Sequence, residues 1–212
     1  MVDPDDPRQG ELFYRPIVAF DFDGTLTVRD SYTAFLAWRA GPAAYALGLA
    51  SLWPATVSYL AKPDRGRLKA AATRRFLGGV PLAEVEADAR RFAEASARTL
   101  FRPDAIRAWK RWQADNARLV IVTASPEPVI APFARGLGAT ALIGTRLAVD
   151  EAGRVTGDFD GPNCRGEEKV VRLKAMFGED VRLEAAYGDT DGDTQMLALA
   201  EEKGFKVFQG TP

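Results

Sequence analysis

The chain has 212 residues, with 28 basic and 29 acidic side chains, one cysteine and no histidine. Its length predicts one domain, or one domain with a sizeable insertion. Without histidine, the Ser-His-Asp and Cys-His hydrolases, the histidine phosphatases and the histidine-ligated zinc sites are excluded. The balanced charge argues against a nucleic-acid partner. A bound metal must then be held mainly by oxygen, which favours Mg²⁺ or Ca²⁺.

The single cysteine and the N-terminal segment bear on the cellular compartment. Cys164 cannot form an internal disulfide, which is typical of a reducing compartment. Residues 1–15 are acidic and rich in proline, and they lack the apolar stretch of a secretory signal. We therefore expect a cytoplasmic protein with a loosely held N-terminal tail.

The first predicted strand, residues 15–23, ends in two carboxylates. Side chains alternate along a strand, so Asp21 and Asp23 point to the same side. Two like charges held close together cost free energy unless a cation or a shared proton lies between them. The pair therefore predicts a bound ligand, and the alternative is a turn in which an aspartate caps the backbone.

A helical region follows at residues 29–103. Its apolar residues recur at helical spacing, most clearly at residues 82–100, and no strand pattern interrupts them. Glycine and proline predict breaks near residues 41–42, 54, 63 and 78–79. We expect this region to be a separate helical cap, inserted into a core domain made of residues 1–28 and 104–212.

The rest of the chain alternates between helices and strands. Helices are predicted at residues 104–114, 127–136, 167–177 and 193–202. Strands are predicted at residues 118–123, 140–143, 183–187 and 205–208, with a hairpin at residues 144–161 around a turn at 150–153. This alternation predicts an α/β fold, in which a parallel sheet is covered by helices on both faces.

Polar residues collect directly after the apolar strands and at the start of one helix. They are Asp21, Asp23, Thr123, Lys169, Asp189 and Asp193. Sites in parallel sheets form at the carboxyl ends of the strands, so these side chains should meet at one edge. The set suits phosphoryl transfer, because one carboxylate can attack phosphorus while a second acts as acid and base. Mg²⁺, a lysine and a hydroxyl would then offset the charge of the phosphate.

Four segments resemble the ordered motifs of the haloacid dehalogenase superfamily. They are DFDGTLT at residues 21–27, VIVTAS at 120–125, EEK at 167–169 and YGDTDGD at 187–193. The resemblance extends from about residue 16 to the end of the chain. It implies a Rossmann-like core with an inserted C1 helical cap, as in the subfamily IB phosphatases that include phosphoserine phosphatase and the phosphatidylglycerophosphatase C-type enzymes.

The resemblance also implies a role for each motif residue. Asp21 would be the nucleophile and Asp23 the general acid and base. Mg²⁺ would be bound by Asp21, the backbone carbonyl of Asp23 and Asp189, with Asp193 in a supporting position. The residues implied to bind phosphate or substrate are Gly24, Thr25, Thr123, Ala124 and Lys169.

Two departures from the family pattern concern the substrate. Gly24 and Asp30 stand where phosphoserine phosphatases usually have serine and glutamate, which argues against phosphoserine. Residues 40–61 carry no charge, and residues 62–75 are strongly basic. The apolar stretch is either buried in the cap or part of a dimer surface. Alternatively, it forms an apolar hairpin, and the protein contacts the inner face of an anionic membrane peripherally through residues 40–75.

The sequence thus predicts a Mg²⁺-dependent phosphomonoester hydrolase that acts through an aspartyl-phosphate. The expected substrate is a lipid-linked or otherwise hydrophobic phosphate. The alternatives are a phosphatase of a small metabolite such as phosphoserine, a phosphotransferase, and a catalytically silent phosphate-binding module.

Overall fold

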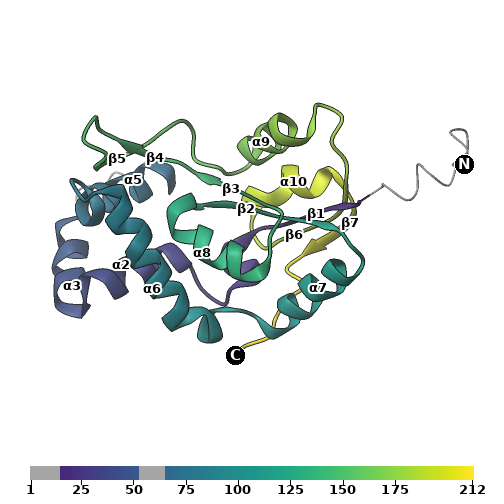
Figure 1. Cartoon of the computed structure of the whole chain (residues 1–212), viewed down its shortest axis with the longest axis horizontal. Helices are drawn as coiled ribbons and strands as arrows, with labels where there is room; N and C mark the ends of the chain where they lie inside the picture. Colours follow the sequence, from purple (N-terminus) through teal and green to yellow (C-terminus); the bar gives the residue numbers. More distant parts are fainter. Residues whose placement is uncertain (1–14, 53–64) are drawn as a thin grey trace, which may run out of the picture.

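A parallel five-stranded sheet lies at the centre of the computed structural model, which describes residues 15–52 and 65–212. Residues 1–14 of the predicted tail, and the breaks predicted at residues 54 and 63, lie outside the described residues. The strands are ordered β3-β2-β1-β6-β7 across the sheet (Figure 1). Their bounds are Ile17–Phe20 for β1, Arg118–Pro126 for β2, Ala141–Thr145 for β3, Leu183–Gly188 for β6 and Ala200–Phe205 for β7. The predicted α/β fold with a parallel sheet is confirmed.

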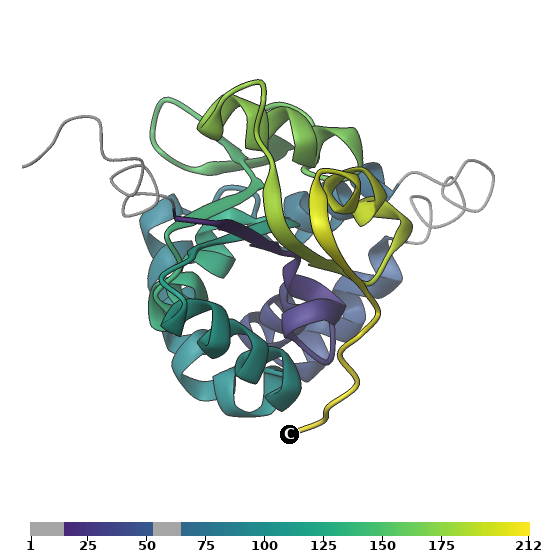
Figure 2. The same cartoon turned by 90° about the vertical axis from the view of Figure 1, so that its right-hand side faces the viewer.

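Helices cover both faces of the sheet because the strand side chains alternate between two apolar clusters. In β1, Val18 and Phe20 face the cluster that contains residues of α7 (Pro103–Ala114) and α8 (Glu127–Leu137). Ile17 and Ala19 face the other cluster, with residues of α9 (Glu167–Phe177) and α10 (Thr194–Ala198). Figure 2 shows α9 and α10 together on one side of the sheet. Burial on both faces explains why β1 and β2 are continuous apolar runs.

Four described α-helices lie between β1 and α7 in the chain and are called here the inserted helices. They are α2 (Ser31–Ala40), α3 (Pro42–Ser51), α5 (Arg65–Leu77) and α6 (Leu82–Leu100), and they gather beyond one end of the sheet (Figure 1). The breaks predicted at residues 41–42 and 78–79 are confirmed. Within the described part of the chain, none of the helices combines the length and the apolar character that crossing a membrane requires.

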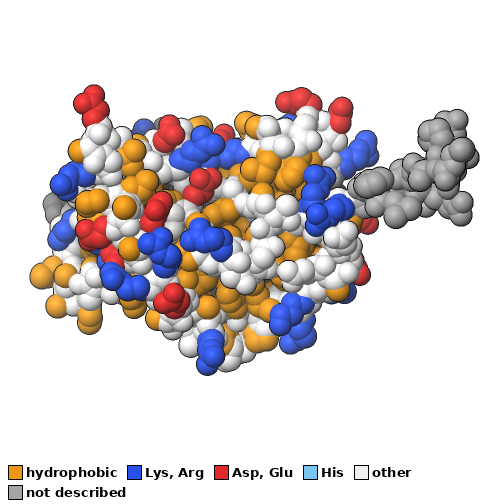
Figure 3. All heavy atoms as spheres, viewed as in Figure 1, with side chains coloured by type: hydrophobic (Ala, Val, Ile, Leu, Met, Phe, Trp, Pro, Cys, Tyr) orange, Lys and Arg blue, Asp and Glu red, His pale blue; other side chains and the backbone are white. Residues whose placement is uncertain are grey.

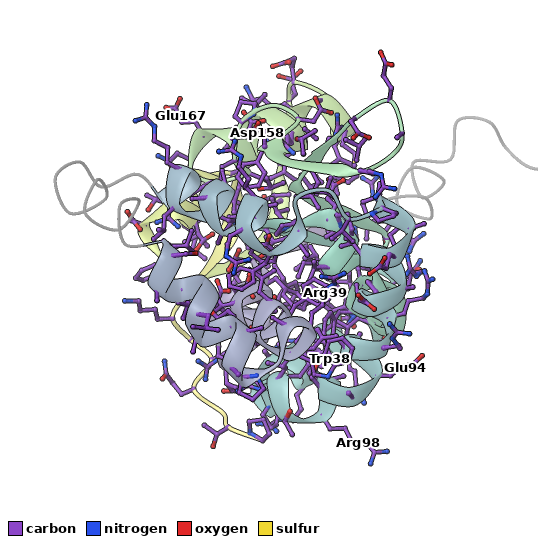
Figure 4. All side chains as sticks on the ribbon, turned by 90° about the vertical axis from the view of Figure 1, so that its left-hand side faces the viewer. Trp38, Arg39, Glu94, Arg98, Asp158 and Glu167 are labelled. Carbon is purple, nitrogen blue, oxygen red and sulfur yellow. The ribbon has the colours of Figure 1, made fainter. Side chains whose placement is uncertain are left out.

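Hydrogen bonds between side chains help to hold the inserted helices to one another. The hydroxyls of Tyr32 in α2 and Thr73 in α5 are 2.7 Å apart. The Arg39 guanidinium in α2 donates to Asp88 in α6 at 2.7 Å and to Glu84 at 2.7 Å. In Figure 4, Arg39 lies among the helices, whereas Arg98 points away from them.

The chain enters and leaves the inserted helices through two segments that lie side by side. The backbone amide of Val28 donates to the Leu100 carbonyl at 2.8 Å, and that of Arg102 donates to the Leu26 carbonyl at 2.9 Å. The predicted limits of the cap, residues 29 and 103, fall next to this pairing. The division into two domains itself stays a prediction.

The predicted hairpin is formed by β4 (Leu147–Val149) and β5 (Val155–Phe159), which pair in antiparallel fashion. It packs against the end of α5 rather than against the main sheet. The Gly79 amide donates to the Val155 carbonyl, and the Val155 amide donates to the Val80 carbonyl, both at 2.8 Å. The hairpin therefore ties the inserted helices to the part of the chain that follows β3.

The prediction was wrong at the C-terminal end of the chain. The helix expected at residues 193–202 ends at Ala198, and the last strand is Ala200–Phe205 rather than residues 205–208. This strand lies at the edge of the sheet, and its middle residues, 201–203, are exposed and charged. Its position depends on backbone pairing with β6, so it needs no apolar pattern that the sequence could show.

Candidate active site

The acidic residues meet where the strand order reverses. From β1 the chain continues to β2 and β3 on one side of the sheet, and later to β6 and β7 on the other. Asp21 directly follows β1, and its amide donates to the Tyr187 carbonyl in β6 at 2.9 Å. Asp189 directly follows β6. The two carboxylates therefore flank the crevice in which open α/β sheets bind their ligands.

The turn after Asp21 requires glycine at position 24. Gly24 has a φ of +85°, which side chains disfavour. A Cβ added there would lie 2.2 Å from Oδ2 of Asp189. The backbone of the turn can therefore approach the Asp189 carboxylate closely only without a side chain at this position.

Lys169 connects three elements at the base of the site. Its buried ammonium group donates at 2.6 Å each to Asp21 Oδ1, Asp193 Oδ1 and the carbonyl of Val122 in β2. Burial by itself would lower the pKa of Lys169, but the charges of Asp21 and Asp193 outweigh it and raise the pKa above its ordinary value. The lysine thus stays charged, and its three N–H groups are all used.

Asp193 is a supporting residue rather than a free ligand. One of its oxygens accepts from Lys169, and the other accepts from the Asp189 amide at 3.2 Å, the Thr190 amide at 3.0 Å and the Thr190 hydroxyl at 3.1 Å. Although burial opposes it, Lys169 lowers the pKa of this carboxyl below its ordinary value. Asp193 thus accepts from four protein donors, three of them on one oxygen, which leaves it less available to a cation than a carboxylate with one donor.

Asp23 is held by hydroxyl groups from two different elements. Oδ1 accepts from the amide and the hydroxyl of Ser31 at 2.7 and 2.5 Å, and Oδ2 accepts from the Ser125 hydroxyl at 2.5 Å. Burial raises the pKa of Asp23, the charge of Asp30 adds to this, and the hydrogen bonds from Ser125 and Ser31 oppose it. A raised pKa shifts a carboxyl toward the protonated form that a general acid needs.

Asp21 keeps one oxygen available. Oδ1 accepts from Lys169, and no hydrogen bond to Oδ2 is found among the described residues. Burial raises the pKa of Asp21 to about 7, although Lys169 lowers it. Asp189 is similarly open, because its carboxylate accepts one long hydrogen bond, from the Thr25 hydroxyl at 3.4 Å.

The oxygens of Asp21, Asp189 and Asp193 fit a divalent cation. One carboxylate oxygen from each lies within 4.8 Å of the others. Asp193 accepts from four protein donors, whereas Asp21 and Asp189 each accept from one among the described residues, so their oxygens are the more available. A purely oxygen donor set suits Mg²⁺, and a cation would offset the cost of holding two carboxylates together. The predicted contribution of the Asp23 carbonyl stays a prediction.

A cavity of about 170 Å³ opens beside Asp21 and Asp193, and Asp189 is not among its lining residues. Of the residues singled out in the sequence, those that line the cavity are Asp21, Asp23, Asp30, Thr123, Ala124, Lys169 and Asp193. Thr123 is buried, and its hydroxyl accepts from the Ser125 amide at 3.0 Å. The hydroxyl of Thr25 faces Asp189 instead. The roles of Gly24 and Thr25 in substrate binding stay predictions.

Several residues of the site were missed by the motif analysis. Ser31 and Lys69 come from the inserted helices, and the cavity lining also includes Asn163, Arg165 and Thr190. Ser31 directly follows Asp30, which caps α2 by accepting from the Thr33 amide at 2.6 Å, and that capping signal could have located it. Lys69 is one of many basic residues in its segment, and no local pattern distinguishes it.

Comparisons with known proteins place the chain in a family. The model of the haloacid dehalogenase-like hydrolases matches residues 18–198. Protein CicA of Caulobacter vibrioides is 58% identical over 207 residues, which are 97% of this chain and 93% of that protein.

Two solved structures share the fold at low sequence identity. A protein of unknown function from Bordetella pertussis Tohama I has a TM-score of 0.72 and 23% identity, with 87% of this chain and 86% of that chain covered. A phospho-aspartyl intermediate analogue of phosphoserine phosphatase has a TM-score of 0.59 and 21% identity, with 89% and 85% covered. By its motifs, its fold and the match to the family model, this chain belongs to the haloacid dehalogenase-like hydrolase family.

Proposed function

We propose that the chain is a Mg²⁺-dependent phosphomonoester hydrolase that acts through a phosphorylated Asp21. The observation that carries this proposal is the pairing of two carboxylates with different surroundings in one cavity. Asp21 is held by Lys169 with one oxygen open, and Asp23 is held by two hydroxyl groups. One carboxylate suits attack on phosphorus, and the other suits proton transfer. The phospho-aspartyl analogue that shares the fold supports this assignment.

The first step transfers the phosphoryl group to the enzyme. A carboxylate oxygen of Asp21 attacks phosphorus, and the bond between phosphorus and the ester oxygen breaks. Asp23, in its protonated form, gives its proton to the departing oxygen, so that an alcohol leaves. The products of this step are the free alcohol, the aspartyl-phosphate at Asp21 and the Asp23 carboxylate.

The second step restores the enzyme. Asp23 takes a proton from a water molecule as that water attacks phosphorus, and the bond between phosphorus and the Asp21 oxygen breaks. Inorganic phosphate leaves, Asp21 is again a carboxylate and Asp23 is again protonated. Lys169 holds Asp21 in place throughout, and the Thr123 hydroxyl is available to donate to the phosphoryl group.

The open oxygens of Asp21 and Asp189 would hold Mg²⁺. When bound, the ion supplies positive charge that reduces the repulsion between the anionic nucleophile and the anionic phosphate. Asp193 helps to hold Lys169 and the backbone of Asp189 in place, because it accepts a hydrogen bond from each of them.

The inserted helices would act as a C1-type cap over the site. Ser31 is the first residue of α2 and donates two hydrogen bonds to Asp23. The position of this helix therefore determines how the Asp23 carboxyl is held. Asp30 and Lys69 bring charged side chains from the same helices to the cavity. A cap in contact with the acid is placed to exclude water and to select the leaving group.

The test is Mg²⁺-dependent release of phosphate from an aryl phosphate, phosphoserine and a hydrophobic phosphate ester. Asp21→Asn should lower kcat by at least about 1,000-fold, because it removes the nucleophile. The exposed Asp180→Asn serves as the control and should keep full activity. A chelator should abolish activity, and Mg²⁺ should restore it.

Retained activity in a folded Asp21→Asn protein would overturn the mechanism. Added acceptor alcohols separate the remaining alternatives, because a phosphotransferase would give new phosphate esters while a hydrolase gives only inorganic phosphate. Binding of phosphate without turnover of any ester would favour the catalytically silent module.

A further inference from the structure

A second, larger cavity lies among the inserted helices and meets the acidic cavity at one side chain. Its volume is about 510 Å³, three times that of the acidic cavity, and it is called here the apolar pocket. Its walls include Leu36 of α2, Tyr45 and Leu49 of α3, and Phe76 of α5. Lys69 lines both cavities. It is the only charged side chain among the described residues that line the apolar pocket.

Lys69 has hydrogen-bonding capacity that Lys169, the other lysine of the site, lacks. Lys169 uses all three of its N–H groups on protein acceptors. Arg165 is paired with Asp191 and donates to the Thr190 hydroxyl. The Lys69 ammonium donates to the Ala124 carbonyl at 3.0 Å, and no other hydrogen bond of this group is found in the part of the chain that the structure describes. Two N–H groups therefore remain for an anionic ligand.

The apolar pocket offers a polar leaving group few partners, because besides Lys69 its described polar side chains are the hydroxyls of Tyr32, Thr33 and Tyr45. The Tyr32 hydroxyl is engaged with Thr73 at 2.7 Å, and the Tyr32 ring lies 5.9 Å from the Lys69 ammonium. A leaving group with an amino or carboxyl substituent would have to give up water with few partners in exchange, which costs free energy. An alkyl or aryl group would instead replace water along the apolar walls.

We propose that the apolar pocket binds the alcohol portion of the substrate, and that Lys69 binds the phosphoryl group at the junction of the two cavities. The inference rests on the proposed function and specifies its substrate class, a phosphate monoester of an apolar alcohol. The phosphoryl group lies in the acidic cavity, and the apolar chain extends between α2, α3 and α5.

The experiment compares the kcat/KM of the full-length enzyme for ethyl, hexyl and decyl phosphate below their aggregation concentrations. We expect at least a tenfold rise from ethyl to decyl phosphate. Leu49→Glu should remove most of this rise, because Leu49 lines the pocket. Leu47→Glu is the matched control: it makes the same change on the same helix at a position that is 70% exposed and is not among the lining residues.

Lys69 is tested separately from the pocket. Lys69→Met should raise the KM of all three esters and the inhibition constant of inorganic phosphate by about tenfold or more, with a smaller effect on kcat. Lys110→Met, an exposed lysine of α7, is the control and should change neither constant.

The outcomes separate this inference from the proposed function. Hydrolysis of all three esters at equal kcat/KM, or equal effects of Leu47→Glu and Leu49→Glu, would overturn the inference and leave the hydrolase intact. If none of the three alkyl esters is hydrolysed but the aryl phosphate is, the inference fails and the proposed function stands. If the aryl phosphate and phosphoserine are not hydrolysed either, the proposed function fails. Calorimetry on the Asp21→Asn protein then tests binding in the apolar pocket without turnover. Equal affinity for decyl and ethyl phosphate would exclude binding of the alcohol portion in the pocket.

Discussion

Helices α6 and α3 belong to the same insertion, but they use their apolar residues in opposite ways. Helix α6 buries Val85, Ala89 and Phe92 in the main core, and all its charged residues except the buried Asp88 are exposed. Helix α3 carries no charge, yet its one buried residue is Gly48, while Leu47 is 70% and Leu49 48% exposed. Figure 3 shows the apolar side chains that gather on the surface over α3.

The difference shows that apolar content and burial are separate properties of a helix. In α6 the apolar residues recur with helical spacing, so one face can pack against the protein. In α3 the apolar residues lie on all sides of the helix. The helix approaches α5 closely at Gly48, where an added Cβ would lie 2.3 Å from the Phe76 ring. Changes in α6 should therefore affect folding, whereas changes in α3 should affect what the surface and the pocket bind.

The largest effect is expected from Phe92→Ala in α6. The Phe92 ring is buried and lies 5.7 Å from the rings of Phe35 and Trp38 and 5.9 Å from that of Phe133. Its removal leaves a cavity between α2, α6 and α8, so the free energy of unfolding should fall by about 3–5 kcal/mol in urea titrations. Phe205→Ala, at an exposed site, is the control and should cost much less. A loss below about 1 kcal/mol at Phe92 would contradict the role assigned to α6.

A smaller loss is expected from Arg39→Met, which removes the ionic connection between α2 and α6. Asp88 is buried, and among the described residues the exposed Arg91 is the one ionic partner that it keeps without Arg39. Unfolding in urea should become easier by about 1–3 kcal/mol, since a buried charge loses its hydrogen-bond donor. Arg98→Met changes an arginine that points away from the fold (Figure 4) and should stay within about 0.5 kcal/mol of the unmodified protein. Equal losses in both variants would show that the Arg39 pair contributes nothing specific.

The smallest effect on folding is expected from Leu47→Glu in α3. Its side chain is already exposed, so the free energy of unfolding should change by less than about 0.5 kcal/mol. The membrane contact predicted for residues 40–75 stays a prediction, and this variant tests its described part. On that prediction, anionic vesicles carry the unmodified protein upward in a density gradient, and Leu47→Glu at least halves the floated fraction. If the unmodified protein stays entirely at the bottom of the gradient, the predicted membrane contact is excluded.

Sequence reasoning located the residues that follow strands, because parallel strands bring their carboxyl ends to one edge wherever the rest of the chain goes. Asp21, Asp23, Lys169 and Asp193 therefore meet as expected. It could not locate Lys69, since the helix that carries this residue reaches the site only through tertiary packing. It misplaced β7 for a related reason: backbone pairing with β6, and not side-chain pattern, determines where an edge strand lies.

The contact between α5 and the β4–β5 hairpin has a consequence for the order of events during synthesis. Arg74 pairs with Asp158, 84 positions later, and the Gly79 carbonyl accepts from Arg154, 75 positions later. While the ribosome is still adding β2 and β3, the hairpin has not yet been synthesised. Helix α5 therefore cannot yet pack against it. The wall that α5 contributes beside the acidic residues is therefore completed late, after most of the chain has been made.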